Sequence, residues 1–89
     1  MLTQEIEIVN KLGLHARAAA KLVNLATAFD ADVEIEKDGK RVNGKSIMSV
    51  MMLAASQGSV LTLHIDGNDE GEAMAQVVEL ISTRFGEGE

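Results

Sequence analysis

One histidine stands where an irregular stretch of the chain gives way to a strongly helical one. His15 is followed by Ala16-Arg17-Ala18-Ala19-Ala20-Lys21, and alanine, arginine and lysine are all good helix formers. The run before it, Asn10-Lys11-Leu12-Gly13, has the composition of a turn. We therefore expect His15 at or near the N-cap of a helix, where backbone N–H groups lack internal partners and the helix dipole is positive.

That position suits an imidazole that acts as a nucleophile toward an anionic group. A neutral imidazole has a lone pair that can attack, and the free N–H groups of the helix can receive the incoming anion. Asn10 to Phe29 contains Lys11, Arg17 and Lys21 but no acid, although the whole chain has a formal net charge of −6. This segregated positive charge favours a phosphoryl group as the electrophile, with Arg17 neutralising its charge. The simpler interpretation is that the histidine only caps the helix.

Composition limits the class of protein. The chain has 89 residues, 46% of them hydrophobic, which is enough for one small domain spanning residues 1–89. It has no cysteine, and therefore no disulfide, thiolate metal site or cysteine nucleophile. Net acidity and only two aromatic residues argue against nucleic-acid binding. No secretory signal is visible, and the longest apolar-rich segment, 16–29, is too short to span a bilayer. We expect a cytoplasmic monomer without membrane insertion.

Hydrophobic periodicity predicts the element order βαββαβα. Strands are predicted at residues 5–8, 32–36, 40–43 and 60–66, and helices at residues 16–28, 47–53 and 69–85. Asp69 and Glu72 have the spacing of a capping box at the start of the last helix, and Gly86 ends it. The tail after Phe85 is expected to fray. This order most simply forms an α+β open-faced sandwich, a four-stranded antiparallel sheet with three helices on one face.

Two segments together resemble one protein family. The active-site segment of HPr, the histidine-containing phosphocarrier of the phosphoenolpyruvate:sugar phosphotransferase system, is similar to Asn10-Lys11-Leu12-Gly13-Leu14-His15-Ala16-Arg17-Ala18-Ala19. The regulatory region of the same family is similar to Asn43-Gly44-Lys45-Ser46-Ile47-Met48-Ser49-Val50-Met51. The resemblance spans nearly all of the chain. At Ala18 the family usually has proline; because both residues suit the first turn of a helix, we expect a loss of rigidity rather than of chemistry.

The resemblance implies a relay of phosphoryl groups. His15 would accept the group on Nδ1 from enzyme I and pass it to the IIA domains of sugar permeases. Arg17 would stabilise the charge of the phosphoryl group, and the backbone N–H groups of Ala16 and Arg17 would be further anion donors. Such a protein forms a phosphohistidine intermediate and is a relay more than a true catalyst. We expect it to need no metal and no organic cofactor of its own.

Ser46 has two interpretations. Its position before a short helix suits an N-cap, a role that needs no further explanation. The resemblance also implies that a dedicated serine kinase, with a matching phosphorylase, can act on Ser46. Whether this happens in the cell is left open by the sequence.

A methionine-rich segment is predicted to dock partner proteins. A helix from 47 to about 53 is too short to bury all of its large side chains, and flexible methionine suits a surface that must fit several partners. The resemblance points to Ile47, Met48 and Met51 as docking residues. On the preceding helix, Ala20, Lys21 and Asn24 could complete this surface. Val50 and Met52 are expected in the core instead.

Two alternatives to a sugar phosphocarrier remain. Ala18 keeps open a paralogous carrier that serves a nitrogen-related regulatory relay. The other is a small α+β module that binds a ligand or a partner, with His15 as a cap. The second histidine, His64, alternates with apolar neighbours in a strand and has no companions for a metal site, so we expect a surface histidine.

Overall fold

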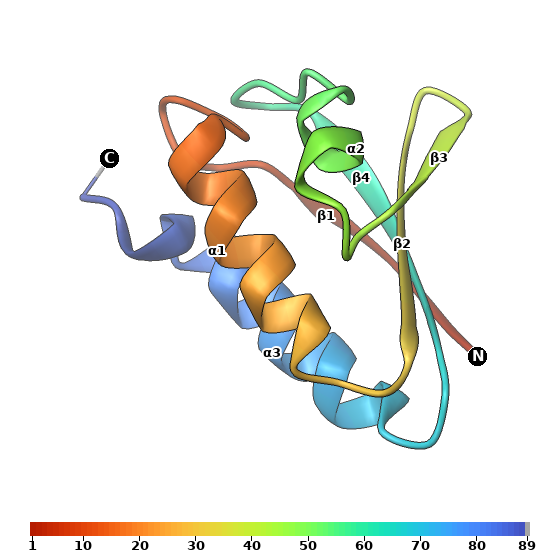
Figure 1. Cartoon of the computed structure of the whole chain (residues 1–89). Helices are drawn as coiled ribbons and strands as arrows, with labels where there is room; N and C mark the ends of the chain where they lie inside the picture. The colour runs from red at the N-terminus through yellow and green to blue at the C-terminus, as the bar shows by residue number, and fades with distance from the viewer. Residues whose placement is uncertain (89) are drawn as a thin grey trace.

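The observed elements follow one another in the predicted order βαββαβα (Figure 1). The structure is a computed structural model and describes residues 1–88. The strands are β1 (Leu2–Glu7), β2 (Asp32–Lys37), β3 (Lys40–Asn43) and β4 (Val60–Asp66), and the helices are α1 (Ala16–Thr27), α2 (Ile47–Met51) and α3 (Glu70–Ser82), followed by the 3₁₀ turn η1 (Arg84–Gly86). Within the described residues, no helix combines the length and apolarity needed to cross a membrane.

The four strands form one antiparallel sheet in the order β1-β4-β2-β3. Alternation along β4 places Leu61, Leu63 and Ile65 on one face, and all three are fully buried. Ile35 of β2 pairs with Leu63 and lies on the same face. The helices cover this face, as Figure 1 shows. The prediction of an open-faced α+β sandwich is therefore confirmed.

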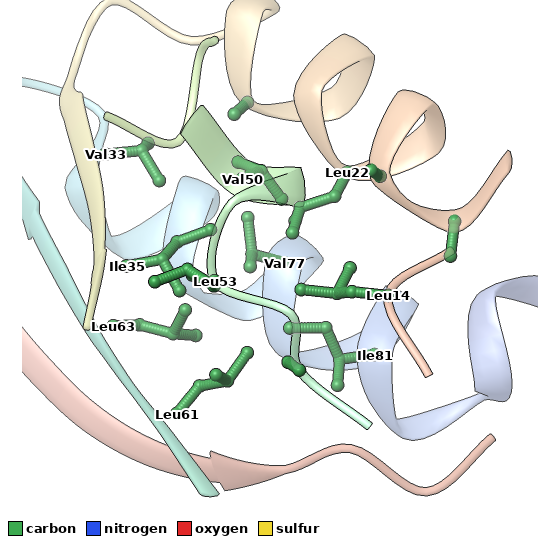
Figure 2. Packing of buried hydrophobic residues seen from close by; sticks show 14 of the residues in the cluster. Leu14, Leu22, Val33, Ile35, Val50, Leu53, Leu61, Leu63, Val77 and Ile81 are labelled. Carbon is green, nitrogen blue, oxygen red and sulfur yellow. The ribbon is translucent and has the colours of Figure 1, made fainter. Parts of the chain in front are cut away.

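The residue before His15 is anchored in the core. Figure 2 shows Leu14 pointing into the cluster formed by α3 residues Val77 and Ile81 and by the sheet. Leu14 is only 5% exposed, and its backbone N–H donates to the Ala55 carbonyl at 2.9 Å. Burial of a leucine side chain contributes about 1.5–3 kcal/mol. Because Leu14 is fixed in this way, the chain presents His15 at the surface.

The last helix ends earlier than predicted. It stops at Ser82, and the Thr83 hydroxyl donates to the Glu79 carbonyl at 2.8 Å. Arg84 and Phe85 then have positive φ values of 59° and 55°, so they turn the chain instead of continuing the helix. Phe85 is nevertheless 1% exposed. Helical spacing correctly predicted a buried Phe85, but a left-handed turn buries it equally well.

The predicted capping box at the start of α3 is wrong. The Asp69 side chain makes no cap hydrogen bond. Its carboxylate accepts instead from the backbone N–H groups of Asp30 and Ala31, both at 2.9 Å. The hydrogen bond from Asp30 is the main reason why the pKa of Asp69 lies below its usual value. Asp69 thus connects α3 to the turn before β2, a contact between residues far apart in sequence.

Gly13 allows the loop before His15 to lie against the segment after α2. Its φ is +66°, a conformation that residues with a side chain rarely adopt. A Cβ atom at this position would lie 2.5 Å from the Ala55 carbonyl oxygen and 2.8 Å from the Ser56 Cα. Both obstacles are backbone atoms, so a side chain at position 13 would have to displace the loop.

We expect Gly13→Ala to destabilise the fold more than Gly39→Ala does. Gly39 also has a positive φ, +83°, but a Cβ there would meet nothing within 4 Å. Gly39→Ala should therefore cost only the strain of the left-handed conformation, about 1–2 kcal/mol. Gly13→Ala adds the collision with Ala55 and Ser56, and urea unfolding should give a clearly larger loss of unfolding free energy. Equal losses in the two variants would contradict the close packing of this loop.

Candidate functional site

His15 is the N-cap of α1, as predicted. Its backbone is extended, with φ −71° and ψ 175°, and its Nδ1 atom accepts a hydrogen bond from the Arg17 backbone N–H at 3.3 Å. The His15 side chain is 27% exposed. One ring nitrogen therefore faces the positive N-terminal end of α1, while the ring stays accessible from outside.

The other ring nitrogen contacts an acid that no sequence pattern connected with the site. The Nε2 atom of His15 forms a hydrogen bond with the Glu87 carboxylate oxygen Oε2. A neutral imidazole has one donor and one acceptor nitrogen. Since Nδ1 accepts from Arg17, the hydrogen-bond network assigns the proton to Nε2, which donates to Glu87. This hydrogen bond is the main reason why the pKa of the Glu87 carboxyl is lowered.

Asn10 holds both the loop before His15 and the Glu87 carboxylate. Asn10 is fully buried. Its side-chain amide donates to the Gly13 carbonyl at 2.8 Å and to Oε1 of Glu87 at 3.0 Å. Both oxygens of the carboxylate thus have a side-chain partner, one in Asn10 and one in His15. From the sequence, Asn10 was predicted only as part of a turn.

The C-terminal segment lies across the start of α1 and does not fray at Glu87. Figure 1 shows this segment, in dark blue, beside the N-terminal half of α1. The Lys21 ammonium group donates to the Phe85 carbonyl at 2.7 Å, and the Glu87 side chain is only 16% exposed. The prediction of a frayed tail is therefore wrong for Glu87, while Glu89 lies outside the described residues. No local pattern predicted this contact, because 72 positions separate His15 from Glu87.

The ring of His15 borders an open hollow of about 710 Å³. The hollow is lined by Lys11, Leu12, His15, Ala16, Arg17, Glu87 and Gly88. Ala16 and Arg17, the predicted anion-binding residues, are both exposed in the first turn of α1. The basic character predicted for the site is thus present, but Glu87 adds an acid to it. The arrangement offers a nucleophilic nitrogen, a cationic side chain and helix N–H groups beside a space open to solvent.

The predicted docking residues lie on two helices in contact, α1 and α2. Ile47, Met48 and Met51 are 39%, 70% and 41% exposed. On α1, Lys21 and Asn24 are exposed and Ala20 is half-buried.

The core predictions for α2 are half right. Val50 is fully buried, as predicted, but Met52 is 64% exposed. Val50 and Leu53, three positions apart, both turn toward the core. Met52 follows the last residue of the helix and points away from that face, so its placement in the core was wrong.

Ser46 caps α2, as expected from the sequence. Its hydroxyl oxygen accepts from the Ser49 backbone N–H at 3.4 Å, and the residue is half-buried. It directly precedes Ile47 and Met48, so any group added to its hydroxyl would border the predicted docking residues.

His64 lies on β4, away from His15. Its Nε2 atom is 2.8 Å from a carboxylate oxygen of Glu36, and its side chain is 14% exposed. The expectation of a surface histidine is thus only partly right, because neighbouring side chains cover most of the ring. Among residues 1–88, no three or more His, Cys, Asp and Glu residues are grouped so that they could hold a metal ion.

Comparisons with known proteins agree with the resemblance of the two motifs. Residues 2–83 match the PTS-HPr family, described as the PTS HPr component phosphorylation site. The phosphocarrier protein HPr of Neisseria meningitidis serogroup B is 56% identical over 89 residues, which is the full length of both chains. The crystal structure of HPr-C-His from Thermoanaerobacter tengcongensis has a TM-score of 0.96 and 49% identity, and the match covers all of both chains.

A second structure bears on the expected monomer. It is described as an HPr dimer from Thermoanaerobacter tengcongensis, and it matches with a TM-score of 0.79 and 52% identity over 92% of this chain and 94% of that one. A monomer is therefore not assured by similarity to solved structures. The family match over residues 2–83 and the 56% identity to an HPr over the full length of both chains show that this chain belongs to the HPr family, the phosphocarriers of the phosphotransferase system.

Proposed function

We propose that His15 carries the phosphoryl group on its Nδ1 atom. The observation that carries this proposal is the N-cap geometry, in which Nδ1 accepts a hydrogen bond from the Arg17 backbone and therefore has its lone pair at the N-terminal end of α1. A phosphoryl group on Nδ1 would lie beside the N–H groups of Ala16 and Arg17 and within reach of a cationic side chain. Phosphoryl transfer depends mainly on such positioning and charge stabilisation.

The transfer step needs no cofactor in this protein. The Nδ1 lone pair of His15 attacks the phosphorus of a phosphohistidine on enzyme I. The donor's P–N bond breaks, and its electron pair stays on the donor nitrogen. In the next transfer an acceptor on a IIA domain of a sugar permease attacks the phosphorus, and the electron pair of the P–N bond returns to Nδ1. The Arg17 guanidinium offsets the negative charge of the phosphoryl oxygens in both steps.

The partners dock on the exposed residues of α1 and α2. Met48, at 70% exposure, is the most exposed of the α2 docking residues, and Ile47 and Met51 lie beside it. Ala20, Lys21 and Asn24 extend this surface along α1. Methionine adapts its shape to different partners, which a relay between enzyme I and several IIA domains requires. This relay operates in the cytoplasm.

His15→Ala should abolish phosphorylation by enzyme I and phosphoenolpyruvate, whereas His64→Ala should leave it unchanged. Of the two histidines, only His15 has a ring nitrogen at the N-terminal end of a helix. Intact-mass analysis after incubation should show one phosphate that is stable in base and labile in acid. A label that survives in His15→Ala, or no label on the wild-type protein, would overturn the proposed function and favour a small binding module.

A phosphate on Ser46 would act on the same docking surface. The N-terminal end of α2 tolerates the added negative charge. That charge would lie next to Ile47 and Met48, where it would repel acidic groups of a docked partner and would cost free energy when the interface removes its water. We therefore assign Ser46 a regulatory role, reversed by a phosphorylase.

Replacement of Ser46 should separate its structural role from this regulatory one. Ser46→Ala should lower the unfolding free energy by about 1 kcal/mol through loss of the cap, with little change in transfer rate. Ser46→Asp should lower the rate of transfer from enzyme I at least about tenfold, equivalent to roughly 1.4 kcal/mol. Rapid mixing with phosphorylated enzyme I, followed by chemical quenching, measures the rate of phosphoryl transfer. Equal transfer rates for the two variants would refute the regulatory role.

A nitrogen-related regulatory relay is the second candidate for the pathway that this carrier serves. Ala18, in place of the proline usual in the family, keeps this candidate open. Ala18 is fully buried in the first turn of α1, which alanine and proline both fit. Transfer rates from the sugar-branch and nitrogen-branch forms of enzyme I decide between them. We expect faster transfer from the sugar-branch enzyme, and much faster transfer from the other would assign the chain to the regulatory relay.

A further inference from the structure

We propose that Glu87 is a positioning residue for His15, acting through the Nε2 atom of the ring. Its carboxylate holds the ring with Nδ1 toward the start of α1, and it offsets the positive charge that forms on the ring when Nδ1 takes up a phosphoryl group. This inference rests on the proposed function of His15 as the phosphoryl acceptor.

The two nitrogens of the ring have different partners, and this fixes the ring's orientation. Nδ1 accepts from the Arg17 backbone N–H at 3.3 Å, and Nε2 donates to Oε2 of Glu87. If the ring carried its proton on Nδ1, this N–H would point at the Arg17 backbone N–H. The lone pair of Nε2 would then face the Glu87 carboxylate. Both contacts therefore favour the same tautomer, the one in which Nδ1 carries a lone pair and no proton.

The carboxylate is itself held in place. Its Oε1 atom accepts from the buried Asn10 amide at 3.0 Å, and Asn10 also donates to the Gly13 carbonyl in the loop that leads to His15. Two residues before Glu87, Phe85 is 1% exposed and its carbonyl accepts from Lys21 at 2.7 Å. A carboxylate anchored on both sides loses little further conformational entropy when it orients a ring.

Charge balance gives the carboxylate a second effect. When neutral Nδ1 attacks phosphorus and the donor's P–N bond breaks, His15 keeps its proton on Nε2, so the ring becomes a cation. No proton moves in this step or in its reversal. A carboxylate hydrogen-bonded to the protonated nitrogen stabilises such a cation, as the aspartate of a Ser-His-Asp triad does for its histidine.

Among residues 1–88, the other charged groups that line the hollow or act on the Glu87 carboxylate, apart from the His15 ring, are cations. Arg17 and Lys21 come from α1, and Lys11 comes from the loop before His15. In the described part of the chain, Glu87 is therefore the one acid that faces His15 from the elements packed around it. Replacing it with a neutral residue removes the carboxylate that accepts the hydrogen bond from the protonated ring nitrogen of phosphohistidine.

Glu87→Gln tests this role, because it keeps the shape of the side chain and removes its charge. We expect it to lower the rate of phosphorylation by enzyme I about tenfold, and Glu87→Asp to recover part of that rate. Glu79→Gln, the same change at an exposed position of α3, is the matched control and should behave like the wild type.

The pH profile of phosphohistidine hydrolysis separates positioning from simple anchoring of the tail. The ring leaves phosphorus readily only while Nε2 carries its proton. Without the nearby carboxylate that proton is lost at lower pH, so the profile of Glu87→Gln should move down by about one pH unit. A residue that only anchored the tail would leave the profile in place.

A measurement on the unmodified protein is independent of any variant and of enzyme I. ¹⁵N NMR of the wild-type His15 ring at neutral to alkaline pH should show the proton on Nε2 and Nδ1 without one. A proton on Nδ1, or a Glu87→Gln variant with wild-type rate and pH profile, would overturn the role of Glu87 while leaving the proposed function intact. Failure of the wild-type protein to be phosphorylated would instead overturn the proposed function itself.

Discussion

The hydrogen bonds of one buried amide, the side chain of Asn10, join the loop before α1 to the C-terminal segment beside His15. This amide donates to the Gly13 carbonyl and to the Glu87 carboxylate. The first bond shapes the loop that leads into α1, and the second holds the acid that meets the histidine ring. Because Asn10 is fully buried, loss of either acceptor would leave a polar group in the core without compensation, which is costly. The geometry of the site therefore depends on a residue that acts on the ring through Glu87 and the Gly13 loop.

The same loop buries Leu14 and leaves the neighbouring His15 side chain partly exposed. Gly13 permits the turn that sends Leu14 inward, and the first turn of α1 then begins at Ala16 with His15 as its cap. The ring of His15 is thus placed by the core through Leu14, by the helix through Arg17 and by the C-terminal segment through Glu87. A carrier must be accessible to successive partners and still keep a defined nucleophile. Because hydrogen bonds at the two ring nitrogens hold the ring, part of it stays exposed to an approaching partner.

The largest departures from expectation occur where distant segments meet. Phe85 was expected to continue a helix, but it forms a left-handed turn that directs the chain toward α1. Asp69 was expected to cap α3, but it binds the backbone of Asp30 and Ala31 instead. Met52 was expected in the core and points outward. For Phe85 and Asp69 the local pattern was compatible with two arrangements, and contacts with distant residues accompany the one that the structure adopts. Met52 differs because α2 ends at Met51, so the helical pattern no longer places it.

The sequence by itself determined the element order, the inward faces of the strands and the position of His15 at the start of α1. These follow from local rules: the alternation of apolar residues in β4, the helical preference of the alanine-rich run, and the turn residues that precede it. Only the tertiary structure decided that Glu87 is the partner of His15. That contact spans almost the whole chain and depends on the turn at Phe85 and on the burial of Asn10. Neither has a local signature, because each depends on atoms contributed by residues far away in the sequence.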